Sequence, residues 1–122
     1  MRIRITIGEL SMDAELNDTP TASKIAAALP LSSSFSTWGD EIYFAIPVDA
    51  PLDESARETV QVGDLGYWPT GKAFCIFFGP TPASRGGDPV PASAVNLVGK
   101  VLGQAKRFKE VVRERLVTIE KA

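Results

Sequence analysis

Short apolar runs separated by glycine- and proline-bearing turns fill most of the chain, and this pattern limits the fold more than any other feature. Residues 2–7 alternate with period two, so that Ile3, Ile5 and Ile7 share one face, and a second extended run covers residues 10–16. Further strands are predicted at residues 31–38, 41–46, 58–62, 65–68, 73–78, 94–102 and 115–120. Many short strands without the alternating helices of a parallel sheet favour a mostly β fold, closed as an antiparallel barrel.

One main helix is predicted at residues 20–29. Thr19 can cap its first free amides, Pro20 suits the first helical position because its missing N–H would be unpaired there, and Pro30 ends the helix. A short helix of one or two turns is expected within residues 104–111.

The most apolar run of the chain, residues 73–78, is expected to be a strand buried on both faces. It contains the single cysteine, Cys75, so no disulfide can form within the chain. Residues 48–57 are acidic and contain proline, which predicts a surface loop with one helical turn. Residues 79–91 contain four prolines and three glycines and are expected to form a long loop.

The composition excludes several classes of function. No histidine occurs among the 122 residues, which removes the commonest metal ligand and excludes Ser-His-Asp triads and Cys-His pairs. We therefore expect no metal and no cofactor. The alternating start of the chain differs from a secretory signal, and no apolar stretch approaches the ~20 residues of a membrane span. These features predict one cytoplasmic domain over residues 1–122 without a membrane partner.

Charge is distributed unevenly along the chain. The formal net charge is −2, yet residues 100–122 carry seven basic and three acidic side chains. Contacts with nucleic acid usually involve a basic domain and interleaved aromatic residues, both of which are missing here. We interpret the basic segment as a solvated face and expect no nucleic-acid partner.

Three segments, taken in order, resemble landmarks of the cyclophilins. Residues 20–25 are similar in position and shape to the helix start after the first hairpin, and residues 42–47 keep the apolar pattern and terminal proline of the central strand. Residues 95–101 resemble the late strand before the second short helix. The phrases at residues 39–44 and 63–69 look more closely like those of a small prokaryotic cyclophilin-like family of uncharacterised proteins.

The resemblance implies a cyclophilin-like barrel and also a missing catalytic group. Cyclophilins place an arginine beside the prolyl nitrogen, where its guanidinium lowers an isomerisation barrier of ~18–20 kcal/mol. In the best register that position is occupied by Phe44, which cannot donate the hydrogen bond. The resemblance therefore favours a binding module over an enzyme.

Aromatic residues on the predicted strands suggest a groove on the barrel wall that holds a proline-containing peptide segment or a small ligand. The alternative is that these side chains only pack the core. The candidate groove residues are Phe44, Tyr67, Trp68, Pro69, Cys75 and Phe77.

Two other hypotheses remain open from the sequence. A peptidyl-prolyl cis-trans isomerase could use a cation relocated to Arg57 or Arg85, both on predicted loops. A small-molecule enzyme could use carboxyl groups at strand ends, namely Asp40, Glu41 or Asp64, although turn formation also explains these residues. Exposed strand edges leave formation of a homo-oligomer open.

Overall fold

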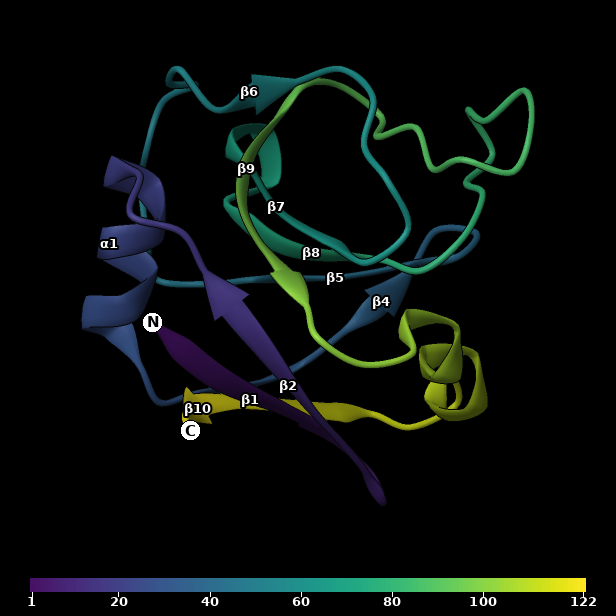
Figure 1. Ribbon diagram of the computed structural model, residues 1–122, viewed down its shortest axis with the longest axis horizontal. Helices are drawn as coiled ribbons and strands as arrows, with labels where there is room; N and C mark the ends of the chain where they lie inside the picture. The colour runs from purple at the N-terminus through teal and green to yellow at the C-terminus, as the bar shows by residue number, and fades with distance from the viewer.

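Ten strands form one continuous antiparallel sheet that curls into a barrel (Figure 1). The computed structural model describes all residues, 1–122. The strands are β1 (Arg2–Ile7), β2 (Leu10–Leu16), β3 (Leu31–Ser34), β4 (Ser36–Thr37), β5 (Glu41–Ala45), β6 (Ala56–Arg57), β7 (Asp64–Trp68), β8 (Ala73–Phe77), β9 (Val95–Val101) and β10 (Leu116–Lys121). Their order in the sheet is β3-β10-β1-β2-β9-β7-β8-β5-β4, and β6 adds to β9 outside this path.

The barrel closes through the segment that contains β3 and β4. β3 pairs with β10 at one end of the sheet, and β4 pairs with β5 at the other, with only Phe35 between them. One bent stretch of chain therefore joins both edges, so the predicted strand at 31–38 forms but is interrupted where the barrel closes. The expectation of a mostly β, antiparallel barrel is confirmed.

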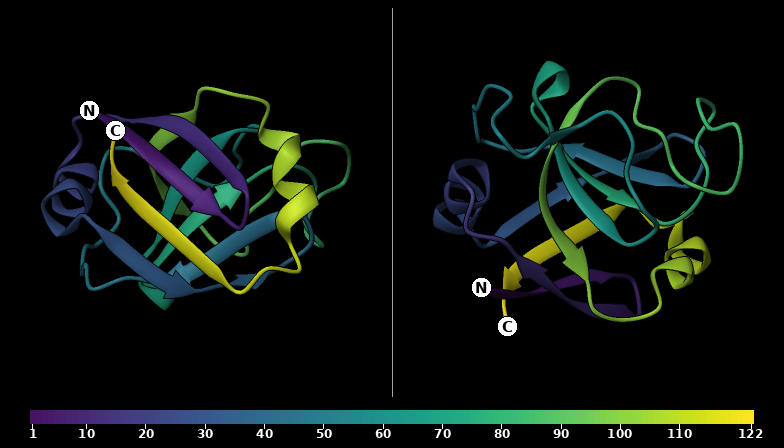
Figure 2. Two further views of the ribbon diagram at one scale, coloured as in Figure 1. Left: turned by 90° about the horizontal axis from the view of Figure 1, so that it is seen from below. Right: turned by 45° about the horizontal axis from the view of Figure 1, so that its top comes forward.

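Helices cover opposite ends of the barrel (Figure 2). The main helix α1 (Pro20–Ala28) begins as predicted, because the Ala22 amide donates to the Thr19 hydroxyl at 3.4 Å. The short helix η2 (Ala105–Val111) is a 3-10 helix that inserts Phe108 into the core. A further 3-10 turn, η1 (Pro69–Gly71), connects β7 to β8.

The segment before β7 differs from the prediction. No strand forms at residues 58–62; the pairing with β9 is made by the two residues of β6 instead. Val60 is buried under the loop that contains Pro89, to whose carbonyl its amide donates at 3.4 Å, so this stretch covers the barrel wall without extending the sheet. The helical turn expected within residues 48–57 is replaced by a hydrogen-bonded turn in which Ala56 N–H donates to the Asp53 carbonyl.

The period-two alternation of the strands separates two hydrophobic clusters. A cluster of 25 buried residues fills the barrel interior, and it includes Phe74 and Ile76 of β8. The intervening residues of β8, Ala73, Cys75 and Phe77, lie on the outer face. With Val60 and Val95 they form a smaller cluster of five buried residues. β8 is thus buried on both faces, as predicted for this run.

A buried polar network attaches the 48–57 loop to the barrel. Asn96 of β9 is fully buried; its amide donates to the Thr21 hydroxyl and the Pro51 carbonyl, each at 2.9 Å. Its carbonyl oxygen accepts from the Asp53 amide, also at 2.9 Å. The Thr21 hydroxyl in turn donates to the Asp53 carboxylate at 2.7 Å. Helix, loop and strand are therefore held together by one side chain.

Replacing Asn96 with alanine should lower the free energy of unfolding by about 2 kcal/mol, because several buried groups lose their partners at once. Urea unfolding curves of the wild type and the variant measure this difference. Glu58→Ala, at an exposed site, is the control and should stay within about 0.5 kcal/mol of the wild type. Equal stability of Asn96→Ala and the control would contradict the network.

Candidate functional site

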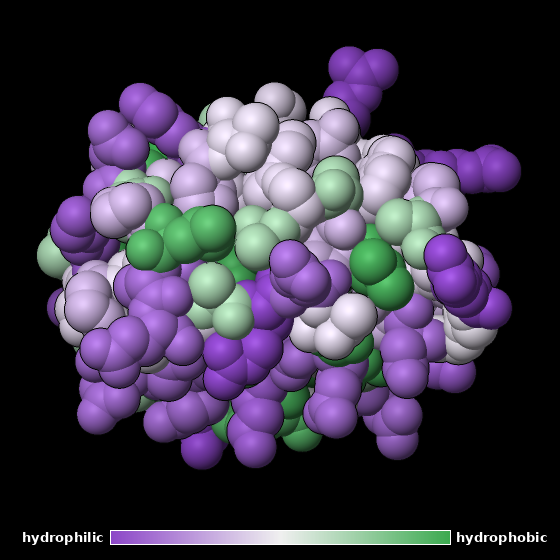
Figure 3. Space-filling model, turned by 90° about the horizontal axis from the view of Figure 1, so that it is seen from above, coloured by the Kyte–Doolittle hydropathy of each residue, from purple (hydrophilic) through white to green (hydrophobic).

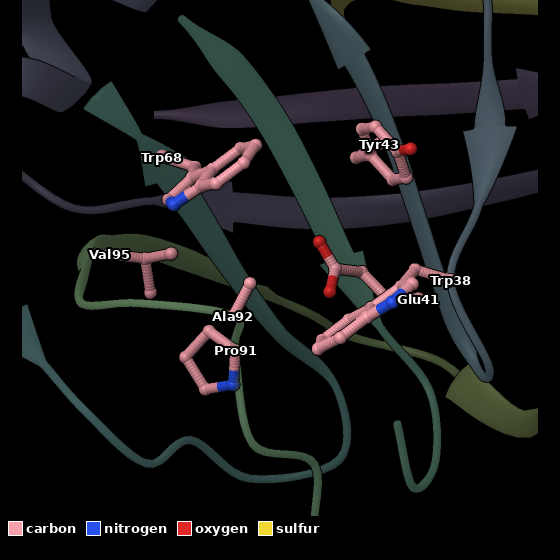
Figure 4. Close-up of a pocket in the computed structure, with 7 residues that line it drawn as sticks. All are labelled: Trp38, Glu41, Tyr43, Trp68, Pro91, Ala92 and Val95. Carbon is pink, nitrogen blue, oxygen red and sulfur yellow. The ribbon is translucent and has the colours of Figure 1, made fainter. Parts of the chain in front are cut away.

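A small aromatic pocket lies on the outer face of the sheet, above the second hydrophobic cluster (Figure 4). Its volume is about 150 Å³. Seven residues line it: Trp38, Glu41, Tyr43, Trp68, Pro91, Ala92 and Val95. They come from the β4–β5 turn, β5, β7, β9 and the long loop that precedes β9, so distant parts of the sequence meet at this point.

Strand periodicity places Glu41 and Tyr43 in the pocket. Ile42 and Phe44 of β5 point into the barrel, so the alternate residues Glu41 and Tyr43 face outward. Trp38 is positioned by the turn that precedes β5, where its amide donates to the Glu41 carbonyl at 2.9 Å. That turn needs glycine at position 39, because φ is +59° and a Cβ would lie 2.9 Å from the Thr81 backbone.

The opposite wall is formed by Trp68 and the 91–95 segment. The Trp68 indole N–H donates to the Ser93 hydroxyl at 2.6 Å, which fixes the ring against this segment. Beneath it, Gly66 lets Val95 and Phe77 approach the strand, since a Cβ there would lie 3.0 Å from the Val95 side chain. The two tryptophans and the tyrosine are all partly exposed and border one space (Figure 4).

Glu41 is the only charged residue in the lining. It is 6% exposed, and its carboxyl group points into the space between Trp38, Tyr43 and Trp68 (Figure 4). Burial raises the pKa of this carboxyl to about 7, and a hydrogen bond from the Cys75 thiol offsets part of the rise. No lysine or arginine lines the pocket, so the carboxylate has no cation beside it.

Cys75 lies below the pocket on β8 and is fully buried. Burial, with the nearby Glu41 carboxylate, raises the pKa of the thiol well above its usual value. Its sulfur also lies 3.8 Å from the Ala73 carbonyl, so the thiol has two acceptors within reach. Both effects favour the protonated thiol, which is a weak nucleophile.

We expect Cys75 to resist alkylation in the folded protein. Iodoacetamide at pH 8 should label the native chain at least about a hundredfold more slowly than the chain in 8 M urea, because the thiol is both buried and protonated. Mass spectrometry of timed samples measures the rate. Rapid stoichiometric labelling of the native protein would contradict this placement.

The residues predicted for a groove separate into three groups. Trp68 lines the pocket, and Cys75 and Phe77 lie on the same outer face beneath it. Phe44 and Tyr67 point into the barrel instead. Pro69 follows Trp68 in the η1 turn and does not line the pocket.

Phe44 does not line the aromatic pocket and lies mainly in the barrel core. Phe44 is 3% exposed and stacks on Phe74 with ring centroids 5.5 Å apart. It reaches only a neighbouring, more polar depression that shares Tyr43 and Trp68. Tyr67 is also internal, and its hydroxyl donates to the Val48 carbonyl at 2.6 Å.

The other sequence candidates lie apart from the pocket. Arg57 donates to the carbonyls of Ala56 and Glu54, at 2.9 and 3.4 Å, and Arg85 is exposed in the long loop. The Asp40 carboxylate lies 3.6 Å from the Lys109 ammonium group. The Asp64 carboxylate accepts from the backbone N–H of Gln61 at 2.8 Å and lies outside the pocket. The hypothesis of paired carboxylates therefore retains only Glu41 in this site.

Five pocket residues were not predicted from the sequence: Trp38, Tyr43, Pro91, Ala92 and Val95. The alternation of β5 could have identified Tyr43, because the apolar Ile42 and Phe44 define the inward face. Pro91 had no comparable signal, since only the folded loop brings it to β5.

Larger and more polar depressions occur elsewhere on the surface, and one of them is lined by both Arg57 and Asp64. On the face seen in Figure 3, hydrophobic residues form small patches among hydrophilic ones. No group of three or more potential metal-ligating side chains occurs. None of the helices combines the length and apolar character that a bilayer crossing needs.

Comparisons with known proteins place this geometry in context. The profile of the family described as Cyclophilin-like matches residues 1–120. The solution structure of the hypothetical protein AF2241 from Archaeoglobus fulgidus is 39% identical, with a TM-score of 0.82, and the match covers 100% of this chain and 95% of that one. McbB, solved in complex with tryptophan, is 14% identical with a TM-score of 0.72, and the match covers 98% of this chain and 44% of that one. No curated relative matches the chain.

Proposed function

Because the chain belongs to the cyclophilin-like family, we propose that it is a binding module whose aromatic pocket holds a small ligand or the proline ring of a peptide segment. The observation that carries this proposal is the meeting of Trp38, Tyr43 and Trp68 around one small open space. Aromatic walls offer large contact area and lose little rotamer entropy on binding.

The size of the pocket limits what enters it. A volume of about 150 Å³ is comparable to that of an engineered protein cavity that binds benzene. One five- or six-membered ring therefore fits, whereas a drug-sized ligand usually needs roughly 300 Å³ or more. A peptide or larger ligand would place one ring in the pocket and leave the rest on the surface.

The proposal is tested by titration of single-ring compounds and proline peptides while the tryptophan signals are followed. The chain has two tryptophans and both line the pocket, so indole N–H shifts and intrinsic fluorescence report on this site directly. N-acetylproline methylamide, short proline peptides and single-ring amines and alcohols are suitable probes. Tryptophan is added because McbB was solved with it.

The expected result is saturable binding by at least one probe class. Trp68→Ala should weaken that binding about tenfold, and Trp68→Phe, which keeps a ring, should weaken it much less. If no probe moves either indole signal, or if Trp68→Ala binds as the wild type does, the pocket is not the ligand site.

Prolyl isomerisation is tested in the same chain by a protease-coupled proline-peptide assay. No cation lines the pocket, so we expect no acceleration above the uncatalysed rate. Acceleration that disappears in Arg57→Ala or Arg85→Ala would replace the binding proposal with an isomerase that uses a relocated arginine.

A second candidate function is proton transfer by Glu41, favoured by its pKa of about 7 in an apolar space. The probe is 5-nitrobenzisoxazole, which opens when a base removes its ring C–H proton and the N–O bond breaks to give a phenolate. Turnover that rises with pH through about 7 and is absent in Glu41→Gln would support this function. Equal rates for the wild type and Glu41→Gln would exclude it for this substrate.

A further inference from the structure

We propose that the occupant of the aromatic pocket carries a positively charged nitrogen, held by the Glu41 carboxylate and by the faces of Trp38, Tyr43 and Trp68. This inference rests on the proposed function, since it names the ligand class of the same pocket. The ligand would be a ring-sized organic ammonium group, either free or at the end of a larger molecule.

The pocket lining contains no positive charge to balance the Glu41 carboxylate. A buried carboxylate is strongly destabilised unless a cation or several hydrogen bonds accompany it. Among side chains, only the Cys75 thiol lowers the pKa of Glu41 by hydrogen bonding, and a thiol is a weak donor. Glu41 is only 6% exposed, so bulk water does not fully solvate its carboxylate. An ammonium ligand would supply the partner that the chain lacks.

Basic side chains near this face of the barrel are engaged elsewhere. The Lys109 ammonium group lies 3.6 Å from Asp40, and the Lys72 ammonium group lies 3.6 Å from Asp49. Neither lines the pocket. The carboxylate is therefore accessible to an external cation without displacement of an internal ion pair.

The aromatic walls of the pocket also favour a cationic ligand. Aromatic faces attract cations through their electron-rich centres, and the attraction is stronger where the contact is shielded from water. Two tryptophans and a tyrosine border the space into which the carboxyl group points (Figure 4). Aromatic faces with a carboxylate form a combination that suits organic ammonium groups and repels anions.

The alternative occupants use the pocket less completely. An internal proline ring is neutral and has no N–H, so it leaves the Glu41 carboxyl without a donor. An anion would meet the carboxylate directly. A compact ammonium group satisfies both the charge and the volume of about 150 Å³.

Two probes of nearly equal shape test the inference. Pyrrolidine is protonated at pH 8, whereas tetrahydrofuran has the same ring size and no charge. Each is titrated into the wild type, Glu41→Gln and Glu58→Gln at pH 8, with the two indole N–H signals as the readout. Glu58→Gln is the control, because it removes one negative charge at an exposed position outside the pocket and leaves the ion pair of Asp40 with Lys109 intact.

We expect the wild type and Glu58→Gln to bind pyrrolidinium at least about tenfold more tightly than tetrahydrofuran. Glu41→Gln should bind both probes equally, and its dispersed spectrum verifies that it is folded. Equal binding of the two probes by the wild type would overturn the cation inference and leave the proposed function intact. If pyrrolidinium, tetrahydrofuran and the proline and single-ring probes all leave the indole signals unchanged, the proposed function itself fails.

Discussion

Glu41→Gln is expected to raise the free energy of unfolding at pH 8 by about 2 to 3 kcal/mol and to remove a pH dependence of stability between pH 4.5 and 8. Burial raises the carboxyl pKa from its ordinary 4.5 to about 7. The folded protein thus prefers the protonated form. The stabilisation that follows is fully present below pH 4.5 and is lost as the pH rises through 7. A change from 4.5 to about 7 corresponds to about 3 kcal/mol.

Subtracting the stability curve of the wild type from that of Glu41→Gln gives the contribution of the Glu41 carboxyl to the pH dependence. Urea unfolding is measured from pH 4.5 to 8.5 for the wild type, Glu41→Gln and the exposed control Glu58→Gln. The titratable groups beside Glu41 are the Cys75 thiol of β8 and the Tyr43 phenol of its own strand, and both remain in the variant. A difference curve that is flat with pH would mean that Glu41 is solvated as an ordinary surface carboxylate.

Phe44→Ala is expected to lower the free energy of unfolding by about 3 to 5 kcal/mol, because a buried aromatic ring is removed from the barrel core. The lost stacking on Phe74 adds to the cavity left behind. Chemical unfolding at pH 7 measures the loss. Since small domains are stable by only about 5 to 15 kcal/mol, this variant is expected to lie near the limit of folding.

If the alanine variant does not fold, Phe44→Leu tests whether Phe44 lies in the core or on the binding surface. It should lose about 1 to 2 kcal/mol and bind pocket ligands as the wild type does, because the ring lies in the core. Trp68→Ala should behave in the opposite way, with weaker binding and a smaller loss of stability. A Phe44→Leu variant with full stability and weak binding would return Phe44 to the binding surface.

The sequence was sufficient for the barrel because its strands show period two and its turns contain glycine or proline. Residues 2–7 and 10–16 alternate clearly, and β1 and β2 form with these bounds. Thr19 and Pro20 marked the start of α1 for local reasons that tertiary contacts do not change. The prediction of a strand at residues 58–62 was wrong, because Val60 is buried against the loop that contains Pro89 and does not pair within the sheet.

The pocket was harder to predict for two physical reasons. The resemblance to the cyclophilin arginine strand made Phe44 a candidate groove residue, although strand alternation puts it on the same face as Ile42. The inward position of Ile42 on the same strand favours the observed assignment. The second reason is that Pro91 and Ala92 reach the pocket only through the folded path of a long loop, which no local pattern encodes.

The most direct test of the account is an NMR titration of the Glu41 side-chain carboxyl carbon, recorded without ligand and with saturating pyrrolidinium. A ligand that binds the ionised carboxyl more tightly must lower its pKa, by thermodynamic linkage. We predict a pKa near 7 in the free protein and a clear decrease when the pocket is filled. A free pKa near 4.5 that pyrrolidinium leaves unchanged would contradict both the buried carboxyl and the cation site.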